Sequence, residues 1–265
     1  MPFTPSHAVV ALPFVRTPLV PAAIAIGAMT PDLPLFVRGI GLGYGFTHAV
    51  GNVVWTALIA FVLFLLWRVL LRPALAELSP ERLARRLPAE WGIGAGAAAR
   101  QAVGVGQRRA YPALLAASLL LGVLSHILWD LFTHEGRAGV EWLPFLDEQW
   151  GPLRGFTWLQ HGSGLVGLVV IGIWMLLRLR RLETGAVPER LLPGWVRTAW
   201  WLSLPVILVA AWLAGLVMLG PLTDRFTVQH LAYRVLPPAC AAWGAVTIAL
   251  CAVIAVRRGR RASSL

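Results

Sequence analysis

Lysine is missing from this sequence of 265 residues, and all 23 of its basic residues are arginines. Its absence excludes chemistry that depends on a lysine amine, such as a Schiff base, a P-loop lysine or a Ser-Lys dyad. Cysteine is also scarce. Cys240 and Cys251 lie eleven residues apart in one apolar run, about 16 Å along a helix, which is too far for a bond between them. A disulfide framework is therefore excluded.

Charged residues are also scarce. Only 13% of the residues are charged and 58% are hydrophobic, whereas a soluble domain has about a quarter of its residues charged. A surface of this composition cannot face water. The sequence therefore predicts an integral membrane protein.

Five uninterrupted apolar runs come close to the about 20 residues that a membrane-spanning helix needs. They predict an all-α, polytopic helical membrane protein with five spanning helices, which forms a single integral membrane domain over residues 1–265. The runs cover residues 50–67, 110–129, 155–177, 198–223 and 235–256.

Residues 1–49 lack a complete span. Residues 17–31 carry no charge before Asp32, but they are short, and Pro18 and Pro21 interrupt them. We expect re-entrant or interfacial helices in this segment, and a sixth span is the alternative. A signal peptide is not expected, because no positive residues precede the first apolar stretch.

Two further regions complete the predicted organisation. Residues 50–136 contain the helices that carry the motifs described below, joined by an arginine-rich loop over residues 68–109. In that loop we expect an amphipathic piece around residues 78–87 and a flexible Gly/Ala stretch over residues 92–106. Residues 137–265 supply the C-terminal helices.

The arginines predict the orientation in the membrane. Seventeen of the 23 follow the first, third or fifth apolar run, and arginine-rich loops stay in the cytoplasm. We therefore expect a multi-pass protein of the inner (plasma) membrane with a cytoplasmic C-terminus and all six histidines on the outer side. The net charge of +11 then reports orientation. No nucleic-acid partner is expected, because the arginines follow no recognition pattern.

One motif carries a chemical signal inside a predicted span. His126 and Asp130 are four residues apart, so their side chains share one face of a helix. An ionisable pair in an apolar span is costly and marks a functional site by default. Nitrogen and oxygen donors one turn apart suit Zn²⁺, Mn²⁺ or Fe²⁺. The alternative is a His–Asp hydrogen bond that joins two helices.

Three weaker motifs lie in the first 49 residues. They are Thr4-Pro5-Ser6-His7, Thr30-Pro31-Asp32 and Phe46-Thr47-His48. Singly, each has a structural explanation: a helix cap, a helix end and an interfacial residue.

Taken in order with the block from Gly122 to Asp130, which runs into Thr133 and Gly136, these motifs resemble the YdjM-like family of membrane-bound metal-dependent hydrolases. The resemblance is closer still to an uncharacterised prokaryotic membrane family of similar layout, and it covers residues 1 to about 136. It suggests distant kinship with the zinc-dependent phospholipase C and nuclease fold. It implies one or two divalent metal ions, zinc foremost. The implied ligands are His7, Asp32, His48, His126 and Asp130.

The sequence departs from this family after Asp32. Leu33, Pro34 and Leu35 stand where relatives tend to have a second aspartate and a histidine, which argues against a second or third metal. His134 extends the stripe of His126 and Asp130, so it either compensates or is incidental.

Several other residues are candidates for the chemistry. His161 is a possible additional ligand or proton donor, and His134 a possible ligand. Asp32 or Asp130 serves as a ligand or as the base that takes a proton from water. His230 is expected at the surface. Candidate partners for a substrate phosphate are Arg38, Arg137 and Arg154.

We therefore expect a metal-dependent hydrolase, phosphoesterase-like, that acts on an ester or phosphoester at the outer membrane interface. Its expected partners are membrane lipid and a small-molecule or lipid-linked substrate. The alternatives are a proton-coupled transporter, with a relay through His126, Asp130 and His161, and a non-catalytic membrane scaffold that keeps the ligand geometry. Serine catalysis is disfavoured because the sequence around Ser163 lacks the full G-x-S-x-G pattern.

Overall fold

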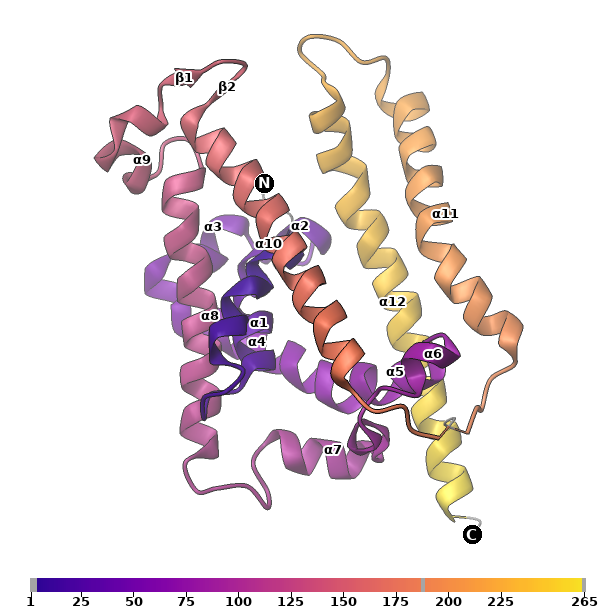
Figure 1. Ribbon diagram of the computed structural model, residues 1–265. Helices are drawn as coiled ribbons and strands as arrows, with labels where there is room; N and C mark the ends of the chain where they lie inside the picture. Colours follow the sequence, from indigo (N-terminus) through magenta and orange to yellow (C-terminus); the bar gives the residue numbers. More distant parts are fainter. Residues whose placement is uncertain (1–3, 187–188, 264–265) are drawn as a thin grey trace. The chain divides into compact units, whose positions relative to one another are not determined.

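The computed structural model describes residues 4–186 and 189–263, and these residues are mainly helical (Figure 1). The sheet in the described part of the chain is a two-stranded antiparallel hairpin of β1 (Gln149–Trp150) and β2 (Leu153–Arg154). In its register Gln149 pairs with Arg154 and Trp150 with Leu153.

Five helices are long and apolar enough to cross a bilayer. The first covers Val50–Leu78 and combines η3 (Val50–Asn52), α4 (Val53–Leu66), the π-helical turn η4 (Trp67–Leu71) and α5 (Arg72–Leu78). The prediction of an all-α polytopic membrane protein is confirmed. The other four are α8 (Tyr111–Thr133), α10 (Gly155–Arg181), α11 (Gly194–Leu219) and α12 (Val228–Ser263).

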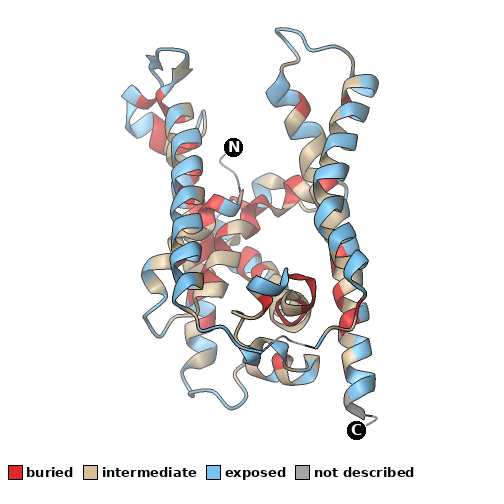
Figure 2. Cartoon of the chain, turned by 45° about the vertical axis from the view of Figure 1, so that its right-hand side comes forward, coloured by how far each residue is buried: buried red, intermediate tan, exposed pale blue. Residues whose placement is uncertain are grey.

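Apolar residues cover the exposed surfaces of these helices. In Figure 2, α11 and α12 are largely pale blue, the colour of exposed residues, although both sequences are strongly apolar. Exposed apolar surface of this extent would be unstable in water. It is the surface that lipid tails cover in a spanning helix.

The chain divides into two compact units. The first unit contains the described residues up to Pro34, Leu42–Phe64 and Val103–Leu182. The second contains Leu35–Gly41, Leu65–Ala102 and the described residues from Glu183 onward. That the two act as a single membrane domain stays a prediction.

The N-terminal segment of the first unit consists of short helices. The 3-10 helix η1 (Thr4–Phe14) leads into α1 (Pro21–Met29), whose nine residues are about 14 Å long. That length is too short for the about 30 Å hydrocarbon core of a bilayer, and the described part of this segment contains no helix long enough for a sixth span. The elements that follow are η2 (Thr30–Asp32), α2 (Leu33–Phe36) and α3 (Tyr44–Thr47).

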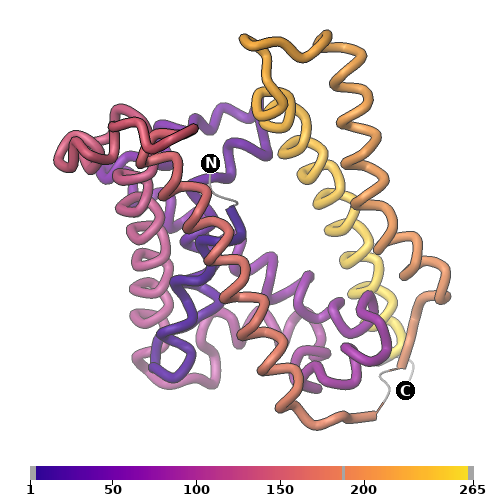
Figure 3. The backbone as a smooth tube through the Cα atoms, turned by 45° about the horizontal axis from the view of Figure 1, so that its top comes forward, coloured from indigo at the N-terminus to yellow at the C-terminus, as the bar shows by residue number. Residues whose placement is uncertain are grey.

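Two glycines let α1 lie directly against α8. A Cβ atom on Gly122 would overlap the carbonyl oxygen of Ile24, and one on Gly27 would lie 2.5 Å from the carbonyl oxygen of Leu119. Small residues at a helix crossing allow this close backbone approach. The crossing brings the C-terminal end of α1 beside the second half of α8, while η1 packs between α1 and α10 (Figure 3).

Beyond α8, the first unit continues through α9 (Ala138–Trp142), η6 (Pro144–Leu146) and the β hairpin. Val140, Leu146 and Phe156 form a small buried cluster there. This cluster anchors the connection between the two spanning helices α8 and α10.

The second unit differs from the sequence prediction for residues 68–109. The first span continues as helix to Leu78, and the stretch expected to be flexible contains α7 (Ala95–Ala102). Alanine has the highest helix propensity, and five alanines in α7 outweigh the neighbouring glycines. The other short helices of this region are α6 (Glu81–Ala84) and η5 (Ala89–Gly92).

Glu77 anchors the core of the second unit. Its buried carboxylate accepts hydrogen bonds from the backbone N–H groups of Leu191 and Leu192, both at 3.0 Å, and lies 3.4 Å from an Arg197 nitrogen. The apolar cluster beside it includes Leu78 and Cys251. Both cysteines are free, as the sequence predicted.

Candidate metal centre

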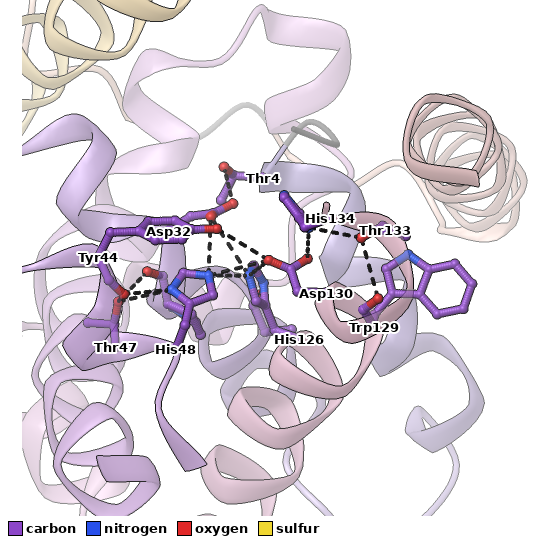
Figure 4. A network of polar contacts seen from close by, with 12 residues as sticks. Thr4, Asp32, Tyr44, Thr47, His48, His126, Trp129, Asp130, Thr133 and His134 are labelled. Atoms are coloured by element: carbon purple, nitrogen blue, oxygen red, sulfur yellow. Dashed lines mark hydrogen bonds and ion pairs between the residues drawn. The ribbon is translucent and has the colours of Figure 1, made fainter. Parts of the chain in front are cut away.

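Four ionisable side chains of the first unit converge in a buried cluster (Figure 4). Asp32 ends η2, His48 follows the last residue of α3, and His126 and Asp130 lie one turn apart on α8. Their exposed fractions are between 1% and 5%, so water does not solvate their charges. Groups of this kind are buried in pairs or around a cation, because an isolated buried charge is very costly.

The hydrogen bonds of His126 and His48 fix which ring nitrogen carries the proton. Nδ1 of His126 lies 2.7 Å from the carbonyl oxygen of Ala28, and Nδ1 of His48 lies 2.9 Å from that of Tyr44. A carbonyl oxygen can only accept, so both Nδ1 atoms donate. In the neutral rings, each Nε2 then has a free lone pair.

These two Nε2 atoms face one another at a distance of 3.2 Å. While both rings are neutral and both Nδ1–H groups are bound to carbonyls, neither Nε2 atom can donate to the other, so their two lone pairs face each other. A cation between them removes this conflict. Histidines that bind metals use the same arrangement, with the other ring nitrogen donating to a backbone carbonyl.

Two carboxylate oxygens complete the set of candidate metal ligands. Oδ2 of Asp130 lies 3.4 Å from Nε2 of His48 and 3.5 Å from Nε2 of His126. Oδ1 of Asp32 lies 3.9 and 3.7 Å from the same two nitrogens. Ligands about 2.0–2.1 Å from a tetrahedral zinc ion are about 3.3–3.4 Å from each other. The atoms of His48, His126 and Asp130 therefore have nearly the spacing that one tetrahedral ion requires, and Asp32 lies slightly farther from the two histidines.

Neighbouring hydroxyl groups orient both carboxylates. Thr4 Oγ1 donates to Oδ2 of Asp32 at 2.7 Å, which leaves Oδ1 toward the histidines. The Tyr44 hydroxyl donates to Oδ2 of Asp130 at 3.3 Å, and its ring stacks on His48 with centroids 3.7 Å apart. Burial raises the pKa of this hydroxyl, so Tyr44 stays protonated and remains a donor.

His7 is the fifth predicted ligand, and it lies against His126 with ring centroids 4.0 Å apart. Its Nε2 atom is buried and has no hydrogen-bond partner among the described residues. Burial, with a smaller effect from His126, lowers the pKa of His7 to about 3, so its ring is neutral. His7, Asp32 and His126 form a second group with ligand atoms within 4.8 Å of one another. Burial also raises the pKa of the Asp32 carboxyl.

His134 lies just beyond α8, beside Asp130. The amide of Gln160 donates to Nε2 of His134 at 3.0 Å, so Nδ1 carries the proton. That Nδ1 lies 3.1 Å from Thr133 Oγ1 and 3.6 Å from Oδ1 of Asp130, a buried oxygen without a hydrogen-bond partner in the described chain. In this arrangement His134 supports Asp130 and has no free nitrogen for a metal.

Gln160 was not predicted as a site residue, whereas its neighbour His161 was. The structure buries Gln160 against His134 and leaves His161 exposed on α10. The sequence could have pointed to Gln160, because a glutamine side chain inside an apolar span is also costly unless it has a hydrogen-bond partner. His230 is exposed in the second unit, as predicted, and pairs with Thr227 at 2.9 Å.

The three arginines proposed for phosphate binding have different surroundings. Arg38 belongs to the second unit, where it donates to the backbone oxygen of Tyr233 at 2.6 Å. Arg154 is engaged with Asp147 at 2.8 Å and Glu135 at 3.3 Å. Arg137 is half-buried at the start of α9, and no carboxylate of the described residues lies within ion-pair distance of it. Of the three, Arg137 is thus the guanidinium of the first unit that remains available.

A family model described as "Domain of unknown function (DUF4184)" matches residues 1–256. No curated protein and no solved structure matches the chain. The match extends through the C-terminal helices, well beyond the first 136 residues that carry the resemblance seen in the sequence. Because the matched range covers nearly the whole chain, the protein belongs to the DUF4184 family.

Proposed function

We propose that the protein is a membrane-bound metal-dependent hydrolase, with zinc as the foremost candidate metal. The observation that carries this proposal is the pair of Nε2 lone pairs of His48 and His126, 3.2 Å apart, with carboxylate oxygens of Asp32 and Asp130 beside them. The resemblance to the YdjM-like hydrolases supports the same ligands. The substrate is an ester or phosphoester of a lipid or lipid-linked molecule.

A divalent ion at this position supplies Lewis acidity, which lowers the pKa of the attacking water and polarises the scissile group. The protein supplies the acceptor for the proton. Oδ1 of Asp130 is buried without a hydrogen-bond partner in the described residues, so it is available to take the proton from water. The water oxygen bonds to the carbonyl carbon or phosphorus, the bond to the leaving oxygen breaks, and that oxygen takes the proton back from Asp130.

The position of the centre within α8 supports a substrate in the headgroup region. His126 precedes the end of this span at Thr133 by seven residues, about 11 Å of helix. The arginines at the other end of α8, Arg108 and Arg109, predict a cytoplasmic location for that end. The centre would then face the outer leaflet of the plasma membrane, with Arg137 near a bound phosphate.

Metal content of the purified protein tests the proposal. Wild type in detergent should retain one or two equivalents of zinc or a similar ion, measured by mass spectrometry, and His126→Ala should retain almost none. The matched control is His230→Ala, which removes an exposed histidine of the second unit. Equal and near-zero metal in wild type and His126→Ala would contradict the metal centre.

Hydrolysis is tested separately. A panel of ester and phosphoester lipids in mixed micelles should yield a product with wild type, should yield none after chelation, and should yield it again when zinc is restored. A metal-free protein that conducts protons in liposomes, and loses this flux in Asp130→Asn, would instead favour the proton relay.

A further inference from the structure

A pocket of about 450 Å³ lies between η1, α8 and α10 of the first unit. Most of its wall is apolar, and three serines, one tryptophan and His7 supply the polar groups. The residues that line it are Ser6, His7, Val9, Val10, Ser125, Trp129, Ser163, Val166, Gly167 and Val170.

Local contacts define the shape of this pocket. Gly167 lets η1 approach α10, because a Cβ atom there would lie 3.0 Å from the backbone oxygen of Ser6. The indole N–H of Trp129 donates to Ser163 Oγ at 3.2 Å and so connects α8 with α10. A pocket of this volume is within the about 300–1,000 Å³ of sites that bind small molecules.

One side of the pocket opens on the surface that lipid covers. Val166 and Val170 are 61% and 40% exposed, and both belong to α10, a helix apolar and long enough to span the bilayer. No water reaches that surface in the hydrocarbon region. The molecules available to fill the pocket from this side are therefore lipid tails.

The other side of the pocket ends at the metal centre. His7 lines the pocket, and its ring lies against that of His126 at a tilt of 31°. The Nε2 atom of His7 is buried without a hydrogen-bond partner among the described residues. An apolar wall thus leads from the lipid-facing surface of α10 to an unpartnered nitrogen of the cluster.

We propose that this pocket binds an acyl chain of a membrane lipid, so that the substrate enters sideways from the bilayer and its scissile group reaches the metal centre past His7. The reaction in this inference depends on the proposed function, whereas the binding does not. It specifies the substrate as an acyl-bearing lipid.

Photolabelling tests the binding without any need for turnover. The full-length protein is reconstituted in phosphatidylcholine vesicles that contain a phosphatidylcholine with a diazirine near the end of one acyl chain. After irradiation, labelled residues are mapped by mass spectrometry. Labelling of Val9 and Val10 is the diagnostic result, because these residues of η1 are half-buried and line the pocket.

A matched pair of variants makes the test specific. Val166→Trp fills the pocket, whereas Val169→Trp places the same side chain at an exposed position of α10 outside the pocket. We expect labelling of Val9 and Val10 to fall at least fivefold in Val166→Trp and to stay within twofold in Val169→Trp, with metal content unchanged in both. Equal labelling in the two variants, or none in wild type, would overturn the proposal.

Measurements of hydrolysis distinguish a failure of the acyl-chain proposal from a failure of the proposed function. Val166→Trp should lower kcat/KM at least tenfold for a long-chain substrate and less than twofold for a short-chain analogue. Pocket labelling without hydrolysis of any lipid contradicts the proposed function alone. Hydrolysis that Val166→Trp leaves unchanged contradicts the pocket alone. A change of oligomeric state in Val166→Trp, with no labelling, would assign the pocket to a second copy of the chain and overturn the inference.

Discussion

At the scale of single residues, the proposed ligand atoms depend on hydrogen-bond partners that are not themselves proposed as ligands. The carbonyl oxygens of Ala28 and Tyr44 select the Nδ1–H tautomers of His126 and His48. Thr4 holds one oxygen of Asp32, so the other oxygen faces the histidines. Changing such a partner alters metal affinity while the ligands remain in the chain.

Thr4→Val tests this dependence, because valine keeps the shape of threonine and removes the hydroxyl that donates to Asp32. We expect metal affinity to fall by about 10–100-fold, the usual effect of losing a partner of a ligand. Competition with a chelator of known affinity measures it. Thr17→Val, at an exposed threonine of the same segment, is the control, and an affinity equal to wild type in Thr4→Val would remove the role assigned to Thr4.

His134→Ala separates support of Asp130 from metal binding. Because Gln160 occupies Nε2 of His134 and Nδ1 faces Asp130, we expect normal metal content and a kcat reduced about 10–100-fold. The exposed neighbour His161, replaced by alanine, should change neither quantity. Loss of the metal in His134→Ala would make His134 a ligand after all.

At the scale of elements, the centre depends on how closely α1 lies against α8. The backbone contact between Gly27 and Gly122 fixes where Ala28 of α1 lies along the axis of α8. It thereby positions the Ala28 carbonyl oxygen for its hydrogen bond with His126. Backbone atoms cannot move aside as a flexible side chain can. A side chain at this crossing must therefore separate the two helices.

Gly122→Ala should destabilise the protein by about 1–3 kcal/mol, the cost of overpacking, and should weaken metal binding. Gly172→Ala is the control, because a Cβ atom on Gly172 of α10 meets no atom within 4 Å; its stability should change by less than about 1 kcal/mol. Thermal unfolding in detergent and metal content measure both effects. A Gly122→Ala protein as stable as the control would show that the crossing relaxes freely.

The sequence predicted some of these elements better than others. The five spans followed from apolar length, and the pairing of His126 with Asp130 followed from helical periodicity. Predicting that His7, Asp32 and His48 lie beside this pair required the family resemblance. Residues 78 or more positions apart in the sequence leave no periodic signal of their proximity. The roles of Ala28 and Tyr44 were unpredictable, since any residue supplies a backbone carbonyl. Helix α7 was missed because the glycines of residues 92–106, most of which lie outside the helix, led to the prediction of a flexible stretch.

At the scale of the whole molecule, the arginine distribution predicts that the connection between α8 and α10 lies outside the cell and the connection between α10 and α11 inside. Two exposed tryptophans provide a matched pair of probes: Trp142 in the first connection and Trp195 at the start of α11. In a background with Cys240→Ala and Cys251→Ala, a membrane-impermeant maleimide should label Trp142→Cys in intact cells. It should label Trp195→Cys only after the membrane is opened, and the reverse pattern would move the proposed centre to the cytoplasmic leaflet.

The proposed centre combines residues from the N-terminal helices with residues of α8. The distance between these two parts along the chain determines the order in which the centre forms. His48 and His126 are separated by 78 residues, which a ribosome adds in about 4–16 s at about 5–20 residues per second. During that interval α1 has no α8 to lie against, and Ala28 has no imidazole to accept from. The proposed centre is therefore complete only after the second span has been made, and an ion could be held by both parts only from then on.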